Sequence, residues 1–174
     1  MQKHVNILVL GAAVLLTIAA CAQTGKSVQT GGSVIETGSP SFEEVQGKVW
    51  VLGELVQESG STTIINRQKL EADGMGDVFT MIVDTERISG KGAPNRYFSS
   101  YTLGPDQEIS ISPIAGTLMM SIVEPEGIQE WEYYNYLEQV NQWLLTGDKL
   151  ELHSETPDGE PIILVYTAKE DAKQ

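Results

Sequence analysis

The sequence is poor in the residues that most often build catalytic, metal and redox sites. Of its 174 residues one is a cysteine and two are histidines, so no intramolecular disulfide and no multi-histidine zinc site can form. The Gly-x-Ser-x-Gly motif of many hydrolases is missing, and no Ser-His-Asp arrangement is recognisable. A hydrolase would therefore lack a nameable nucleophile and base, and we expect a protein without enzymatic activity or cofactor.

Positive charge is scarce as well. The chain has 11 Lys and Arg against 24 Asp and Glu, which gives a formal net charge of −13. Such a surface repels phosphate backbones and anionic lipid headgroups, so nucleic acid is excluded as a partner. Hydrophobic residues still make up 41% of the chain, and a domain of about 130 residues buries enough surface to fold without disulfides.

The first twenty residues have the pattern of an export signal. A short basic start leads into an uncharged run, Ile7–Ala20, whose small residues precede Cys21. The alternative is an uncleaved membrane helix, but this run is shorter than the ~20 apolar residues that a span needs. Residues 18–21, Ile-Ala-Ala-Cys, resemble the bacterial lipobox, in which the cysteine becomes the acylated N-terminus. We therefore expect a lipoprotein signal peptide over residues 1–20, with Cys21 anchoring the chain to a membrane.

A linker follows the expected cleavage site. Residues 21–41 are rich in Gly, Ser and Thr, which predicts a flexible tether; a strand at Ser33–Ile35 is the alternative. An end-to-end distance of ~25 Å would hold the next domain just off the bilayer. That domain spans residues 42–168, and residues 169–174 form a polar C-terminal tail.

Most of residues 42–168 alternate between apolar and polar side chains. A period of two predicts half-buried antiparallel strands, and Gly, Pro, Asp and Ser clusters between them predict turns. In the first run Trp50 and Leu52 lie on one face and Val49 and Val51 on the other. The other alternating apolar residues are Phe79, Met81, Val83, Ile109, Ile111, Leu150, Leu152, Ile162, Leu164 and Tyr166.

One segment, Pro125–Thr146, has helical spacing instead. Its large residues Ile128, Trp131, Tyr134, Leu137, Val140 and Leu144 recur every three or four positions. The spacing predicts one amphipathic helix of about five turns, with Leu137, Val140 and Leu144 facing the sheet and Tyr133 and Tyr136 exposed. The expected fold class is α+β: a curved, mostly antiparallel sheet or incomplete β-barrel of about eight strands with this helix packed against it.

Four segments of this domain resemble the META, or HslJ-like, domain. They are residues 47–52, 88–103, 117–120 and 138–152, and the resemblance covers residues 42–167. It implies an incomplete barrel around a helix, an envelope or secreted setting with links to stress resistance, motility or virulence, and no known catalysis. Many members pair a cysteine before the signature Asn with a second one; Pro94 and Met120 stand near those places here, which implies a variant without that disulfide.

The signature resembled by residues 88–103 supplies the candidate site residues Gly90, Gly92, Asn95, Arg96 and Tyr101. Asparagine hydrogen-bonds readily in turns, and the flanking glycines and proline favour a turn here. We therefore expect these residues to be structural, with ligand contact as the alternative. Gly90-Lys91-Gly92 lacks the spacing of a phosphate loop, and His153 falls on the polar side of a strand, where it is expected to be exposed.

Two functional hypotheses from different classes follow. The first is a non-enzymatic envelope lipoprotein, an accessory or stress-resistance factor that binds an unidentified envelope protein at the periplasmic face of a membrane, in the first instance the outer membrane. The second is a carrier or pilot that holds an apolar ligand, such as an acyl chain, inside the barrel. An empty apolar lumen of several hundred Å³ would favour the carrier, and a lumen filled by Trp131, Leu137 and Leu144 would favour the first hypothesis.

Overall fold

The computed structural model describes residues 40–120 and 125–169. The predicted signal peptide, Cys21 and all of the predicted tether except its last two residues lie outside these ranges. In the described part of the chain, neither helix has the length and apolar character needed to span a bilayer.

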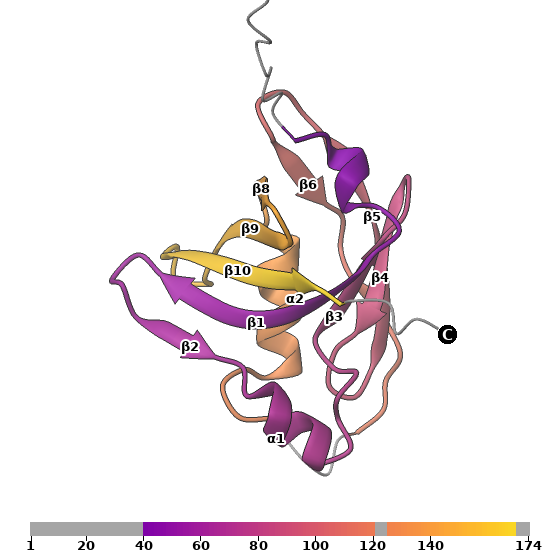
Figure 1. The fold of residues 1–174 in the computed structure, drawn as a ribbon, viewed down its shortest axis with the longest axis vertical. Helices are drawn as coiled ribbons and strands as arrows, with labels where there is room; N and C mark the ends of the chain where they lie inside the picture. Colours follow the sequence, from indigo (N-terminus) through magenta and orange to yellow (C-terminus); the bar gives the residue numbers. More distant parts are fainter. Residues whose placement is uncertain (1–39, 121–124, 170–174) are drawn as a thin grey trace, which may run out of the picture. The chain divides into compact units, whose positions relative to one another are not determined.

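The fold is a nearly closed antiparallel barrel with a helix at its centre, which confirms the expected α+β class (Figure 1). Eight strands follow one another in the sheet in the order β6-β5-β4-β3-β1-β10-β9-β8, while β2 pairs with β1 and β7 pairs with β5. The strands are β1 (Val49–Gln57), β2 (Thr62–Ile64), β3 (Thr80–Val83), β4 (Arg87–Lys91), β5 (Arg96–Leu103), β6 (Ile109–Ile111), β7 (Ala115–Gly116), β8 (Gln142–Thr146), β9 (Lys149–Glu155) and β10 (Pro161–Ala168). The helical elements are the 3-10 turn η1 (Phe42–Val45) and the helices α1 (Arg67–Ala72) and α2 (Glu130–Glu138).

The end strands β6 and β8 meet at a seam. A single bridge joins Glu108 to Gln142, and the amide of Ile109 donates to the carbonyl of Asn141 over 3.1 Å. These contacts are too few to continue the ladder, so the seam is where the barrel remains incomplete. A hollow of about 510 Å³ lies over it on the outer surface, lined by residues that include Thr102, Glu108 and Gln142.

Alternating residues of the strands fill the barrel. On β1 the structure buries Trp50 and Leu52 rather than Val49 and Val51. The other alternating apolar residues singled out in the sequence are buried as well, and Trp50, Leu52, Phe79, Leu150, Leu164 and Tyr166 have no exposed surface. Phe79 lies outside β3 with a positive φ of 51°, and its carbonyl accepts the amide of Leu52 over 3.0 Å. A bulky residue rarely adopts this backbone; here the turn directs the phenyl ring into the core, edge-on to Tyr133 at 5.3 Å.

Three buried tyrosines form a hydrogen-bonded chain across the lumen. The Tyr166 hydroxyl donates to that of Tyr133 over 3.2 Å, and the Tyr97 hydroxyl donates to the carbonyl of Thr80 over 3.0 Å. Because each hydroxyl has one proton, Tyr133 is left to donate to Tyr97, at 3.0 Å. Each of the three tyrosine hydroxyls thus has a hydrogen-bond partner, in an interior where an unpaired hydroxyl would destabilise the fold.

The predicted long helix is wrong in length. Only Glu130–Glu138 is helical, and Gln142–Thr146 is strand β8, which pairs with β9 through the turn at Gly147. Trp143 and Leu145 point inward while Leu144 is half-buried, so these residues follow a period of two. Val140 and Leu144 also fit helical spacing, which is why the sequence favoured one continuous helix.

The orientation of the helix was predicted in part. Leu137 and Val140 are buried as expected, but Tyr133 is fully buried rather than exposed, and Trp131 is 56% exposed rather than part of the lumen. Residues before Glu130 are not helical, and Gly127 has a φ of 95°. The helix is therefore a short plug with one buried face, lying behind β1 and β10 in Figure 1.

The plug makes a first prediction. Leu137→Ala removes a fully buried side chain from the helix, and the resulting cavity should lower the free energy of unfolding by about 2–5 kcal/mol. The control Gln142→Ala, on the exposed side of β8, should change it by less than about 0.5 kcal/mol. Urea melts give both values, and equal midpoints would show that the helix does not fill the barrel.

The tyrosine chain makes a second prediction, concerning pH. Burial raises the pKa of Tyr133 to about 12 from an ordinary value of 10.0, and raises the pKa values of Tyr97 and Tyr166 as well. A pKa raised in the folded state stabilises the protein below the unfolded pKa, and that stability is lost as pH rises through the folded value. The free energy of unfolding should therefore decline between pH ~10 and ~12, and less steeply in Tyr133→Phe. The same slope in both proteins would contradict the assignment.

Candidate functional site

Of the five predicted signature residues, the structure brings Gly92, Asn95 and Arg96 together and places Gly90 within β4 and Tyr101 elsewhere. Gly92 and Asn95 lie in the turn between β4 and β5, and Arg96 is the first residue of β5. Tyr101 lies further along β5 and belongs to a separate group of contacts. Asn95 and Tyr101 are buried, whereas Arg96 is exposed.

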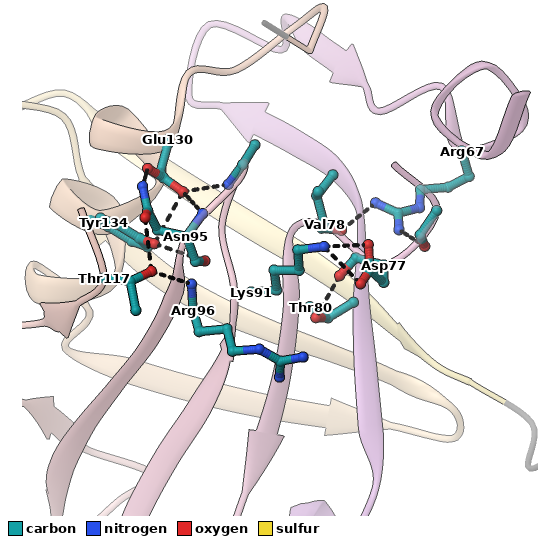
Figure 2. Close-up of polar contacts among 12 residues, drawn as sticks. Arg67, Asp77, Val78, Thr80, Lys91, Asn95, Arg96, Thr117, Glu130 and Tyr134 are labelled. Atoms are coloured by element: carbon teal, nitrogen blue, oxygen red, sulfur yellow. Dashed lines mark hydrogen bonds and ion pairs between the residues drawn. The ribbon is translucent and has the colours of Figure 1, made fainter. Parts of the chain in front are cut away.

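The centre of this site is a carboxylate that the sequence did not reveal. Glu130 Oε1, at the start of α2, accepts the amides of Ala93 over 2.6 Å and Asn95 over 2.7 Å (Figure 2). Its Oε2 accepts the Asn95 side-chain amide over 2.6 Å. Charge-assisted hydrogen bonds of this length are strong, so Glu130 binds the β4–β5 turn to the central helix.

Tyr134, one helical turn after Glu130, completes the carboxylate's shell. Its hydroxyl is 3.2 Å from Glu130 Oε1 and 3.3 Å from the Asn95 carbonyl. Burial and the negative charge of Glu130 raise the pKa of the Tyr134 phenol well above its ordinary value. The phenol therefore stays protonated and acts as a donor.

Asn95 uses its side chain to hold a second segment. Its Oδ1 accepts the Thr117 hydroxyl over 2.8 Å and the Met119 amide over 2.6 Å, and its Nδ2 donates to the Met119 carbonyl over 3.1 Å. The Asn95 amide group thus pairs with the Met119 backbone much as a neighbouring strand would. All of its hydrogen-bonding capacity is used within the protein.

The two signature glycines are required by close packing. A Cβ at Gly92 would lie 2.5 Å from both Glu130 Oε1 and the Tyr134 hydroxyl, and one at Gly90 would collide with the Thr80 carbonyl and stand 2.8 Å from the Tyr97 ring. A methyl group has no space at either position. The glycines therefore let the turn approach the helix and let Tyr97 cross β4.

Tyr101 anchors the other end of β5. Its hydroxyl lies 2.7 and 2.9 Å from the carbonyls of Asp84 and Thr85, which share its single proton, and it accepts from Gln46 Nε2 over 3.2 Å. Its ring packs on Phe42 with centroids 5.3 Å apart. The residue ties η1 and the β3–β4 turn to the barrel.

The outer side of β3, β4 and β5 carries the charged signature residues. Lys91 Nζ lies 2.8 Å from both carboxylate oxygens of Asp77 (Figure 2), and this contact lowers the pKa of Asp77. Arg96 stands directly opposite Lys91 in the ladder. Arg87 lies over the ring of Phe98 at 5.3 Å. A shallow hollow of about 320 Å³ lies over these strands.

The described residues offer no catalytic arrangement. The buried hydroxyls of Ser99 and Ser154 each donate to a backbone carbonyl over 2.6 Å, so neither is paired with a base. His153 is half-exposed on β9, with Glu151 3.6 Å away. Within residues 40–120 and 125–169, no three His, Cys, Asp or Glu side chains converge as a metal site would require.

Comparison with known proteins agrees with this geometry. The family model of the META domain matches residues 43–168, which span all four segments singled out in the sequence. No curated protein matches the chain at a significant level.

Two solved structures share the fold. The NMR structure of a protein from Burkholderia xenovorans has a TM-score of 0.54 and 20% identity, covering 78% of this chain and 94% of that chain. The crystal structure of a DUF4847 family protein from Bacteroides vulgatus has a TM-score of 0.52 and 9% identity, covering 75% of this chain and 98% of that chain. At these identities the likeness concerns the fold alone.

The site makes a third prediction. Asn95→Ala leaves Glu130 and the Met119 backbone with unpaired groups in a buried setting, and should lower the free energy of unfolding by about 1–3 kcal/mol or more. Denaturant melts measure the loss. If Asn95→Ala also loses function, the core variant Val140→Ala, compared at the same loss of stability, should lose function to the same extent. An Asn95→Ala protein of normal stability and abundance but without function would instead identify Asn95, Arg96 and Tyr101 as a partner site.

Proposed function

This chain belongs to the META domain family, and on that premise we propose that it is a non-enzymatic envelope lipoprotein that acts by binding at the periplasmic face of a membrane. A barrel domain of this family whose described residues arrange no nucleophile with a base and no metal site is suited to binding rather than catalysis. The proposed role is that of an accessory or stress-resistance factor, anchored through Cys21, in the first instance to the outer membrane.

The filled lumen is the observation that carries this proposal. Trp50, Tyr133 and Tyr166 have no exposed surface, and the hydroxyls of the tyrosine chain are hydrogen-bonded to one another. An acyl chain would have to displace these side chains and break their hydrogen bonds. The interior therefore argues against the carrier hypothesis, and a ligand or partner is expected on the outer surface.

The anchor follows from the sequence. An apolar run that ends in Ile-Ala-Ala-Cys over residues 18–21 supplies the chain's sole cysteine as the acylation residue. Each methylene buried in a bilayer contributes ~0.8 kcal/mol, so two or three acyl chains hold a protein far more firmly than one. The linker that follows would leave the domain free to reorient at the surface.

The anchor makes a fourth prediction. The mature wild-type protein should carry acyl mass on an N-terminal Cys21 peptide and partition into detergent, whereas Cys21→Ser should lack both the acyl mass and the processed N-terminus. Mass spectrometry of the N-terminal peptide is the measurement, because an uncleaved apolar signal can itself hold a chain at a membrane. Ser27→Ala, in the same linker, is the matched control and should be acylated normally. Acyl mass on Cys21→Ser would contradict the lipoprotein proposal.

A further inference from the structure

One outer face of the barrel combines cations with exposed apolar side chains. This basic face is the outward side of β3, β4 and β5, with Arg87, Lys91 and Arg96 around Ile82 and Phe98. The ladder places Lys91 opposite Arg96 and Ser89 opposite Phe98, so the phenyl ring stands between the cations. Phe98 is 50% exposed and Ile82 is 37% exposed.

The charges of the basic face are unusual for so acidic a chain. Lys91 is paired with Asp77. Among the described residues, however, neither the Arg87 nor the Arg96 guanidinium has an ion-pair partner, although the sequence holds 24 carboxylates. In Figure 2 the Arg96 side chain extends over the sheet without a contact at its guanidinium. Both guanidinium groups can therefore still hydrogen-bond an external anion, although the pKa of Asp77 is lowered by its contact with Lys91 and also by the positive charge of Arg96.

An apolar segment lies beside Arg96. The Thr117 amide donates to the Arg96 carbonyl over 3.0 Å, and Met119 is held by Asn95 as described above. Leu118 and Met120, on either side of this pinned residue, are 101% and 95% exposed. Large apolar side chains that are exposed to water, next to cations, are typical of surfaces that enter a bilayer interface.

We propose that the basic face, together with Leu118 and Met120, docks on the headgroup region of an anionic phospholipid bilayer. The inference rests on the proposed function, because it assigns a binding surface to a domain tethered at a membrane. The guanidinium groups contact lipid phosphates, and Phe98, Leu118 and Met120 enter the interface. The hydrogen bonds of Glu130 and Asn95 then position this surface. They hold the turn that sets Arg96 opposite Lys91 and the segment that exposes Leu118.

The net charge of −13 does not prevent this docking. Charges are screened over about 8 Å at physiological ionic strength, whereas a domain of this size is roughly 30 Å across. Carboxylates on the far side of the barrel therefore act weakly on a bilayer that touches the basic face. Tethering also makes docking intramolecular, so that a modest attraction is sufficient.

The experiment uses the full lipidated chain in liposomes of phosphatidylcholine, with or without phosphatidylglycerol. Because the only native cysteine is the proposed acylation residue, an added cysteine can be labelled alone with bimane. Ser89→Cys places the label on the basic face, and Ser59→Cys places it in the turn between β1 and β2. Quenching by a nitroxide-labelled lipid then reports which side touches the bilayer.

We expect strong quenching at position 89 on anionic liposomes only, and weak quenching at position 59 on both. Arg87→Gln/Arg96→Gln should lower the ratio of docked to undocked protein about fivefold per cation removed. The control Lys149→Gln/Lys169→Gln changes the net charge equally, at exposed positions outside the face, and should preserve docking. Leu118→Ser/Met120→Ser should weaken docking while leaving the melting temperature unchanged.

Other outcomes would overturn the inference. The inference would be wrong if both labels were quenched equally, or if the two charge variants lost docking equally. It would also be wrong if bimane responded to a soluble acidic peptide but not to liposomes, a result that would point to an acidic protein partner. If the proposed lipoprotein function is wrong, the result is different: mass spectrometry finds no acyl mass on Cys21, and the chain does not enter the liposomes through an anchor.

Discussion

The Glu130 carboxylate is the contact on which the signature region depends. It accepts two backbone amides and the Asn95 side chain from the β4–β5 turn, and it stands at the first turn of α2, the helix inside the barrel. Negative charge at a helix N-terminus is favourable, so one group stabilises both the helix and the turn. Gly92 leaves the space that this approach requires. The signature residues of the β4–β5 turn therefore connect the sheet to α2.

The same helix decides what the barrel can contain. Its inner face carries Tyr133 and Leu137, which are fully buried, and the tyrosine chain from Tyr166 to Thr80 crosses the space that a ligand would need. A polar chain in a packed interior is stable only when every member is satisfied. The described part of the protein leaves no buried side-chain nitrogen or oxygen without a hydrogen bond. Binding is for this reason assigned to the outer surface.

The inner network and the outer face are two sides of the same strands. In β5 the side chains of Tyr97, Ser99 and Tyr101 point inward, while those of Arg96 and Phe98 point outward. A shift of one residue in the β4–β5 register would exchange the two sets. By holding the turn, Asn95 and Glu130 maintain the register that gathers cations on one face of an otherwise acidic domain.

The sequence alone indicated the family and many of the barrel strands, because period-two alternation is a local signal that burial of one sheet face imposes directly. The resemblance to the family signature singled out Gly90, Gly92 and Asn95, of which Gly92 and Asn95 lie in the β4–β5 turn and Gly90 lies in β4. Tertiary structure decided the rest. Residues 143–145 fit helical spacing in the sequence, but pairing with β9 makes them a strand. Tyr133 is buried because the helix lies inside the barrel. Glu130 was indistinguishable from many other acidic residues, because its role comes from a turn 35 residues earlier in the chain, and no local pattern encodes contact over that distance.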